Sequence, residues 1–409
     1  MDTEPAPLVK SGLSQSNWIE TPDMTLLSGY SVLDFASVGP AARASRILAD
    51  YGMDIIKVAP VSAQGAKQIE PVFHAYGAGR GTRRIRVDLK SPEGKRTIAR
   101  LVERANVVIE SYRPGVASRL GVGYDDLKAI NPKIVYCSTS GYGQDGPWSQ
   151  WAGHDINYVA VSGYLACSGR DAGGRPALPG ATVADSAGGG MQAALAVIAA
   201  LLNVARGGEG RHLDVSIADG MLNLMSLYID RYLATGEETH PGTDVLTGRY
   251  AWYGVYTCAD GRHVSVGPVE THFFRNLCRL LELEQFSGSQ YDDAKQDEMR
   301  VAFAQRFLTK PRDAWVAALS GENTCVAPVL SIAEVAANPH LRARQSFMHA
   351  NHAERGRFEQ LGPVLAGGER QQPEHQVRPA GTTDTDAVLA AAGFSASEIE
   401  DLRRRGVIE

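Results

Sequence analysis

Short apolar runs alternate with stretches of helical spacing through the first third of the chain. The order strand, helix, strand occurs twice, in the segments 31–36, 41–52, 53–59, 84–90, 91–105 and 106–112. Another apolar run, at 133–143, leads into a glycine-rich loop. Strands that alternate with helices of this length predict βαβ units and a parallel sheet. We therefore expect a doubly wound α/β domain that binds its ligands at the carboxyl ends of its strands.

The pattern changes after residue 240 to short alternating strands and tight turns. Asp260-Gly261 separates two of these strands and is a hairpin signal. Helical spacing returns at 273–281 and 292–307, and again at 387–405 after a polar stretch rich in proline and glycine. We predict a large α/β domain at 26–225, a smaller α+β domain with its linker at 226–340, and a segment at 341–409 whose C-terminal helix returns to the large domain.

One stretch, 193–205, is strongly apolar. It is shorter than the roughly 20 residues that span a bilayer, and the segment before it carries Asp185, three glycines and Gln192. We therefore expect a buried core helix and no membrane association. The first 20 residues contain acids and prolines and no apolar core of the signal-peptide kind, so we expect a cytoplasmic protein.

The composition narrows the class of protein. The 409 residues are 44% hydrophobic and 21% charged, which is typical of a folded chain long enough for two domains. A formal net charge of −5 provides no general basic field, so neither nucleic acid nor an anionic membrane is an expected partner. The five cysteines are widely spaced and include no CxxC pair, which favours reduced thiols over a disulfide framework or a metal site.

Three ionisable groups stand beside glycines or tight turns, where a backbone can approach a ligand closely. They are His154 in GHDINY, Asp185 in PGATVADSAGGG and Glu270 in VGPVETHFF. Each also has a structural interpretation, because His154 could pair with Asp155, and both other residues could cap the helix that follows them. A helix start would also hold Asp185 as a rigid base, and the three glycines after it would leave room for a ligand.

A ligand that carries phosphates needs arginine or lysine. A basic cluster is present at 80–90, and Arg113 and Arg119 follow a predicted strand end, where this fold binds ligands. The first βα turn lacks GxGxxG, so NAD and FAD are not expected. The loop 141–147 could be only a turn, but its glycines could also direct backbone N–H groups at an oxygen of the ligand.

The order of several longer motifs identifies a family. These motifs are LADYGMDIIKV, VDLKSPEG, ESYRPGVASRLGVGY, NPKIVYCSTSGYGQDGP, AGHDINY, VADSAGGG, GRHLDVSIADG, YTCADGRHVSVGPVE and CVAPVLSIAEVAANPHL. In this order they resemble the family III CoA-transferase (CaiB/BaiF) superfamily, and within it the α-methylacyl-CoA racemases. The resemblance implies an acyl-CoA thioester as substrate, with coenzyme A as part of that substrate and no separate cofactor or metal.

The resemblance also implies roles for individual residues. His154 and Asp185 match the catalytic histidine and aspartate of these racemases, and Glu270 matches a glutamate that hydrogen-bonds the histidine. The family's CoA contacts and histidine motif match Val87, Lys90, Tyr112, Arg113, Arg119, Asp155 and Tyr158. The resemblance further implies an interlocked homodimer, in which each active site lies between the large domain of one subunit and the small domain of the other.

In a racemase of 2-methyl-branched acyl-CoA thioesters, one of His154 and Asp185 would remove the α-proton and the other would donate a proton to the opposite face. The enolate formed between these steps would need hydrogen-bond donors at its oxygen. The transferases of the family use an aspartate at the position of Asp185 as a nucleophile and generally lack the histidine. A CoA-transferase is therefore the alternative function, and a CoA-binding protein without turnover is a third one.

The sequence leaves the acyl group open. The segment 244–256 is expected to border it, and Trp252, Tyr253 and Tyr256 could line an apolar pocket or belong to a core. Branched fatty, sterol side-chain and aryl-propionyl thioesters are all compatible with the residues.

Overall fold

The computed structural model describes residues 25–62, 71–379 and 381–409. The predicted absence of an export signal concerns residues outside these ranges. The chain forms two compact units. The large unit comprises the residues up to Ser162, Gly180–Leu224 and Arg342–Glu409, and the small unit comprises Gly163–Pro179 and Met225–Leu341. The segment 163–179, which the sequence boundaries assign to the large domain, therefore clusters with the small unit.

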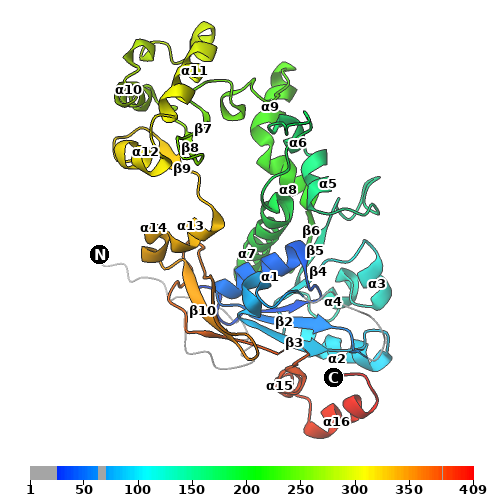
Figure 1. Ribbon diagram of the computed structural model, residues 1–409. Coiled ribbons are helices and arrows are strands. Elements are labelled where there is room, and N and C mark those ends of the chain that lie inside the picture. The colour runs from blue at the N-terminus through cyan, green and yellow to red at the C-terminus, as the bar shows by residue number, and fades with distance from the viewer. Residues whose placement is uncertain (1–24, 63–70, 380) are drawn as a thin grey trace, which may run out of the picture. The chain divides into compact units, whose positions relative to one another are not determined.

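A six-stranded parallel sheet forms the centre of the large unit (Figure 1). The strands lie in the order β3-β2-β1-β4-β5-β6. Their bounds are β1 Ser31–Asp34, β2 Asp54–Ala59, β3 Thr82–Arg86, β4 Val107–Glu110, β5 Val135–Ser140 and β6 His212–Ser216. The predicted α/β fold with a parallel sheet is confirmed. In folds with this strand order, ligands bind where the order reverses, which here is between β1 and β4.

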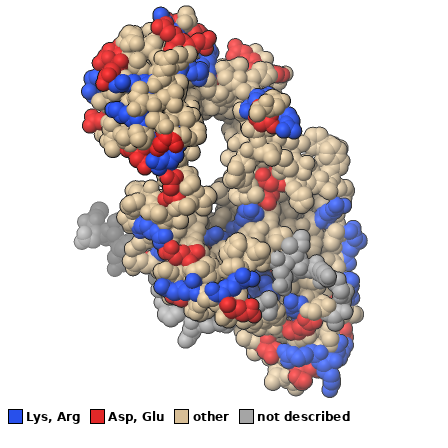
Figure 2. All heavy atoms as spheres, viewed as in Figure 1, with Lys and Arg blue, Asp and Glu red and all other residues tan. Residues whose placement is uncertain are grey.

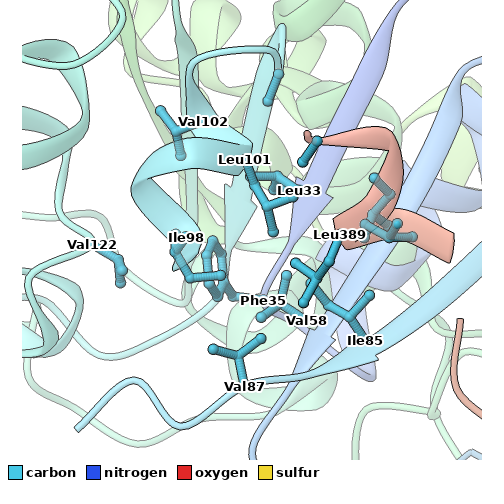
Figure 3. Close-up of a cluster of buried hydrophobic side chains, with 14 of the residues drawn as sticks. Leu33, Phe35, Val58, Ile85, Val87, Ile98, Leu101, Val102, Val122 and Leu389 are labelled. Carbon is cyan, nitrogen blue, oxygen red and sulfur yellow. The ribbon is translucent and has the colours of Figure 1, made fainter. Parts of the chain in front are cut away.

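Helices cover both faces of the sheet because its central strands are apolar on both sides. Every residue of β1, β4 and β5 is buried. The helices are α1 Gly39–Asp50 and α7 Gln192–Ala205 on one face, and α2 Pro92–Val102, α15 Thr385–Ala391 and α16 Ala396–Arg404 on the other. Figure 3 shows the second layer, where Ile85 of the sheet, Leu101 of α2 and Leu389 of α15 belong to one buried cluster.

The start of α2 agrees with its sequence. Ser91 Oγ accepts a hydrogen bond from the Gly94 N–H at 2.9 Å, so Ser91 caps this helix. The other helices of this part of the chain are α3 Val116–Leu120, α4 Tyr124–Lys128, α5 Asp155–Val161, α8 Ile217–Leu224, α14 Pro339–Ala343 and the 3₁₀ turn η2 Ala75–Gly79.

The C-terminal segment lies with the large unit. It contains a three-stranded sheet, with β10 Phe347–His352 between β11 Gly356–Leu361 and β12 His375–Val377. The single helix predicted at 387–405 is wrong. The helices α15 and α16 are separate because Gly393 adopts a φ of +85° and the Ser395 side chain caps α16.

A continuous helix at Ala184–Ala205 packs on α1 and α8. Its first part, η3 (Ala184–Met191), is π-helical, and its second part is α7. The apolar stretch 193–205 is thus the second part of a longer helix than the sequence analysis expected. With 22 residues this helix is long and apolar enough to cross a membrane by length and composition, and half of its apolar window is buried inside the protein.

The three glycines of η3 are buried and serve packing. A Cβ at Gly189 would lie 2.5 Å from Cβ of Pro40, and one at Gly190 would lie 2.7 Å from Cβ of Arg43. No side chain larger than hydrogen fits at such distances. The glycines therefore let α1 approach η3 closely, and the interpretation that they leave room for a ligand is wrong.

The small unit has its own sheet and core (Figure 1). Its antiparallel sheet places β8 His263–Val266 between β7 Gly254–Thr257 and β9 Val326–Pro328, and β7 and β8 form the hairpin predicted at Asp260-Gly261. Its helices are α6 Tyr164–Cys167, α9 Ser226–Thr235, α10 Thr271–Leu280, α11 Gln296–Phe307, α12 Arg312–Leu319 and α13 Ile332–Ala337. Trp252 and Tyr256 are buried in this core, so the core interpretation of these aromatics is confirmed.

Candidate active site

The start of α5 presents the histidine motif. His154 occupies the N-cap position with extended backbone, and its N–H donates to Asn157 Oδ1 at 3.0 Å. This local bond closes the first turn of the helix and leaves the imidazole exposed. Asp155 follows in the first turn of the same helix. The sequence therefore places an accessible imidazole and a carboxylate side by side at one helix start.

Asp185 lies next to this helix start. Its backbone N–H donates to Asp155 Oδ1 at 2.8 Å, which joins the first turn of α5 to the first turn of η3. The predicted capping role of Asp185 is wrong, because the helix already begins at Ala184 and Asp185 is inside its first turn. The Asp155 carboxylate thus holds the backbone of Asp185, and it does not serve only as a partner of His154.

Burial and nearby charges change the pKa of the Asp185 carboxyl group. Burial raises the pKa of the Asp185 carboxyl above its ordinary value, and the nearby Asp155 carboxylate acts in the same direction. Arg43 and His154 oppose this rise, because a cation stabilises the ionised form. A carboxyl group with a raised pKa can exchange a proton closer to neutral pH than a carboxyl group in water.

Tyr158 lies in α5, one turn after the histidine. Its side chain is 6% exposed and fits against two glycines, so that a Cβ at Gly141 would come within 2.6 Å of its ring. Burial, Tyr142 and Asp185 together raise the pKa of Tyr158 to about 12. The phenol is therefore neutral at physiological pH and available as a hydrogen-bond donor.

A cavity of about 230 Å³ opens beside the carboxyl ends of β1 and β2, and the first residues of β3 also line it. Five cations line it, namely Arg46, Lys57, Arg83, Arg84 and Arg378, together with the aromatic rings of Phe73, Tyr76 and His352. Lys57 pairs with the buried Asp34, and Arg83 Nε donates to Asp54 Oδ1 at 3.0 Å. A basic cavity with aromatic walls suits a ligand that carries phosphates and a flat ring.

The basic character is local to this cavity. On the face seen in Figure 2, lysine and arginine side chains are interspersed with aspartate and glutamate. Tyr76 connects the cavity to the site at α5, because Arg43, the neighbour of Asp185, lies 5.4 Å from the centre of the Tyr76 ring. Among the described residues, no three His, Cys, Asp or Glu side chains form a group that could hold a metal ion.

The five residues matched to CoA contacts do not line this cavity. Val87 is buried in the core and forms a β-bridge with Ile408. Lys90, Arg113 and Arg119 are exposed, and Tyr112 is partly buried against the core, where burial raises its pKa to about 12. The cavity instead draws Arg83 and Arg84 from the basic cluster that the sequence analysis noted.

Sequence reasoning missed Arg46, Phe73, Tyr76 and His352 as cavity residues. His352 and Arg378 lie about 300 residues from β2 and β3 along the chain, so no spacing rule connects them to those strands. Arg46 and Tyr76 carry no motif of their own. The one available signal was that Arg46 belongs to the helix after the first strand of a doubly wound fold.

Glu270 belongs to the small unit. It occupies the N-cap position of α10, but its side chain makes no capping hydrogen bond and is exposed. The predicted capping role of this side chain is therefore wrong. The pairing of Glu270 with a histidine of a second subunit stays a prediction.

The strand order, the basic cavity at the strand ends and the carboxylate beside an exposed histidine define a doubly wound α/β protein with a site for an anionic, ring-bearing ligand. The chain belongs to CoA-transferase family III, because the family model matches residues 27–385. This confirms the family that the order of motifs indicated.

The relatives within the family have two kinds of activity. The chain is 32% identical to the α-methylacyl-CoA racemase of Homo sapiens, over 94% of this chain and 97% of that protein. It is 28% identical to the succinyl-CoA:glutarate CoA-transferase of Homo sapiens, over 94% and 90%. The crystal structure of a CaiB/BaiF family protein from Brucella suis is similar with a TM-score of 0.66, at 27% identity, over 79% of this chain and 89% of that chain. Racemases and CoA-transferases are therefore both among the sequence relatives of this chain.

Proposed function

We propose that the protein is a racemase of 2-methyl-branched acyl-CoA thioesters. The observation that carries the proposal is the 2.8 Å hydrogen bond between Asp185 N and Asp155 Oδ1, which brings the start of η3 to the start of α5. An imidazole and a carboxyl group with a raised pKa are thereby neighbours. Two groups that can each carry a proton, one for each face, are what inversion at a carbon acid requires.

In the proposed mechanism, one of His154 and Asp185 removes the α-proton of the thioester and the other protonates the opposite face of the enolate. The nucleotide part of coenzyme A occupies the basic cavity, where arginine side chains meet its phosphates and an aromatic ring meets its adenine. Coenzyme A enters as part of the substrate. The neutral Tyr158 hydroxyl is a candidate donor to the enolate oxygen, since its pKa is about 12.

The proposal includes a homodimer in which Glu270 of one subunit orients His154 of the other. Its support is the family resemblance together with the exposed, uncapped side chain of Glu270. A carboxylate that accepts a hydrogen bond from one imidazole nitrogen fixes the tautomer and raises the basicity of the other nitrogen.

The second candidate function is a CoA-transferase. Its support is the 28% identity to a CoA-transferase over most of the chain. In that reaction the Asp185 carboxylate would attack the thioester carbon, form an acyl anhydride with the enzyme and release the CoA thiolate. The thiolate would attack the Asp185 carbonyl, which gives an enzyme thioester and frees the donor carboxylic acid. An acceptor carboxylate would then attack the enzyme thioester, and the CoA thiolate released would attack the acceptor's acyl carbon in the new anhydride, which forms the new acyl-CoA and frees Asp185.

Exchange in D₂O tests the proposal. A single enantiomer of a 2-methylacyl-CoA is incubated with the protein in D₂O without an acceptor acid, and α-deuterium and enantiomeric composition are followed by NMR. A racemase incorporates deuterium and loses enantiomeric purity. The substitution His154→Gln should abolish the loss of enantiomeric purity, because inversion needs both proton carriers. His240 is an exposed histidine beside Glu238 in the small unit, and His240→Gln should leave racemisation unchanged.

The two functions give opposite results in this experiment. Thioester transfer to an added carboxylic acid, without any exchange in its absence, would establish the transferase and exclude the racemase. Full racemisation by His154→Gln would contradict the mechanism with two proton carriers.

A further inference from the structure

Arg43 on α1 directs all three of its guanidinium nitrogens at the segment that carries Asp185. Nε donates to Ser186 Oγ at 3.0 Å, and Nη2 donates to Thr182 Oγ1 at 2.9 Å. Nη1 lies 3.5 Å from Asp185 Oδ2. One side chain from a different element therefore contacts three residues around the start of η3.

The Nη1 group has hydrogen-bonding capacity to spare. Within the part of the chain that the structure describes, this atom is buried and has no hydrogen-bond partner. Its one close anion is the Asp185 carboxylate, at a distance where the charges attract but no hydrogen bond forms. A donor atom that is buried without a partner is costly, because it loses its bonds to water.

The approach of Arg43 is built into the packing. Gly190 is one turn beyond Asp185, and a Cβ on it would collide with Cβ of Arg43 at 2.7 Å. On its other side, the guanidinium lies 5.4 Å from the centre of the Tyr76 ring, which lines the basic cavity. Tyr76 is itself fixed, because its hydroxyl accepts from Gly39 N–H at 3.0 Å.

From this geometry we propose that Arg43 is a positioning residue that holds the Asp185 carboxylate ionised and in a single orientation. It does so through attraction by Nη1, while the bonds to Thr182 and Ser186 fix the guanidinium. The inference deepens the proposed function, and it rests on that function only for its kinetic consequence. In a racemase, Arg43 would favour Asp185 as the group that removes the α-proton, because the ionised form is the base.

Burial and the charged groups around Asp185 shift its pKa in different directions. Burial raises the pKa of Asp185, Arg43 lowers it, Asp155 raises it and His154 lowers it. The remaining charged groups on the packed elements are Arg46 and Asp50 on α1, His212 and Asp214 on β6 and Asp219 on α8, and none of these contributes to the shift. Arg43 is therefore the permanent cation in the group, since a guanidinium is not deprotonated in proteins.

The first test measures the Asp185 carboxyl directly. The protein is labelled with aspartate carrying ¹³C at Cγ, the Asp185 signal is assigned with Asp185→Asn, and its titration is followed by NMR. In Arg43→Met the pKa should rise by about 1, the low end of the effect of a close opposite charge. The pKa of Asp185 in Arg43→Lys should lie between the values for Arg43→Met and the wild type, because lysine keeps the positive charge but lacks the forked guanidinium group.

A matched control is Arg100→Met. Arg100 also pairs with a carboxylate, Glu398 at 3.0 Å, and lies over an aromatic ring, Phe394 at 3.6 Å, but on α2. This variant should leave the Asp185 titration unchanged. If Arg43→Met does not fold, the comparison of Arg43→Lys with the wild type decides. An Asp185 titration that is the same in the wild type and in the Arg43 variants would overturn the proposal.

The second test measures the kinetic consequence. The acid limb of the pH profile for α-deuterium exchange should move to higher pH in Arg43→Met, with about tenfold slower exchange at a pH below the limb for each pH unit of displacement. KM for the acyl-CoA should change less than kcat. A loss of activity that is uniform across pH would show a structural role and overturn the proposal. Absence of exchange in the wild type would refute the racemase, and the NMR titration would still decide the role of Arg43.

Discussion

Each unit of the protein contains an arginine beside a carboxylate, and the two pairs differ in geometry. In the small unit, Arg312 donates two hydrogen bonds to the Glu334 carboxylate, of 2.5 and 3.0 Å. Ser331 N–H donates to the same carboxylate at 2.8 Å. In the large unit, Arg43 lies 3.5 Å from Asp185 and makes no hydrogen bond to it. The Glu334 carboxylate therefore accepts several hydrogen bonds, whereas the Asp185 carboxylate accepts none from Arg43.

The difference in geometry produces opposite changes in pKa. The hydrogen bond from Arg312 is the main cause that lowers the pKa of Glu334 to about 2. Burial is the main cause that raises the pKa of Asp185. A carboxylate that stabilises a fold is held permanently ionised, whereas one that is to exchange a proton needs a weaker counter-charge. The same two residue types thus serve structure in one unit and, in our proposal, chemistry in the other.

The largest expected effect is a difference in catalytic activity between variants of Asp185 and variants of Glu334. Asp185→Asn should slow α-deuterium exchange by about 10²–10⁴-fold, the usual contribution of a general acid or base. Glu334→Gln is the matched control. It should retain full activity, because the ion pair of Glu334 with Arg312 lies in the small unit and takes no part in the proposed proton transfer. Both are measured in the same D₂O assay. Equal losses in the two variants would remove the distinction between the pairs.

A second effect appears in thermal unfolding. Arg312 is 4% exposed and also donates to Val329 O at 2.9 Å, so Arg312→Met removes two hydrogen bonds from the Glu334 carboxylate and one from this carbonyl. We expect a Tm lower by roughly 5 °C. Arg249→Met removes a similar two-bonded pair with Asp293 that is exposed, and should change Tm by less than about 1 °C. A similar Tm change in both variants would mean that burial of Arg312 does not matter.

The smallest effect is a dependence of stability on pH. Because the folded-state pKa of Glu334 is depressed to about 2, its stabilising contribution is present above its ordinary pKa and is lost as the pH falls toward 2. The difference in unfolding stability between the wild type and Glu334→Gln should therefore be largest at neutral pH and vanish near pH 2. Denaturant titrations across this range measure it. A difference that grows on acidification would contradict the assigned sign.

The sequence predicted the parts of the fold that depend on local periodicity. The apolar runs at β1, β4 and β5 are buried on both sides of the sheet. Continuous apolar runs are typical of strands in a parallel sheet, so the sequence predicted them. The break between α15 and α16 was missed, because Gly393 ends a helix only when it adopts the left-handed conformation, and its residue type does not require that.

The candidate site was predictable where residues belong to a motif. His154, Asp155 and Asp185 came from short motifs, and the structure brings them together. Arg43 and Tyr76 were missed because their roles arise from contacts between segments far apart in the chain. The three glycines of η3 were misinterpreted for the same reason, since the sequence does not tell which element faces a glycine.

The return of the C-terminal segment has a consequence for the synthesis of the protein. Arg84 N–H on the edge strand β3 donates to Asp384 Oδ2 at 2.9 Å, across a separation of 300 residues, and Asp88 N–H donates to Val407 O at 2.8 Å. At roughly 5–20 residues per second, a ribosome needs about 15–60 s to travel that distance. During this interval β3 leaves the ribosome without α15 and α16, which cover it in the finished protein. The nascent chain therefore carries an uncovered sheet face for most of its own translation, and is at that stage a candidate client of chaperones.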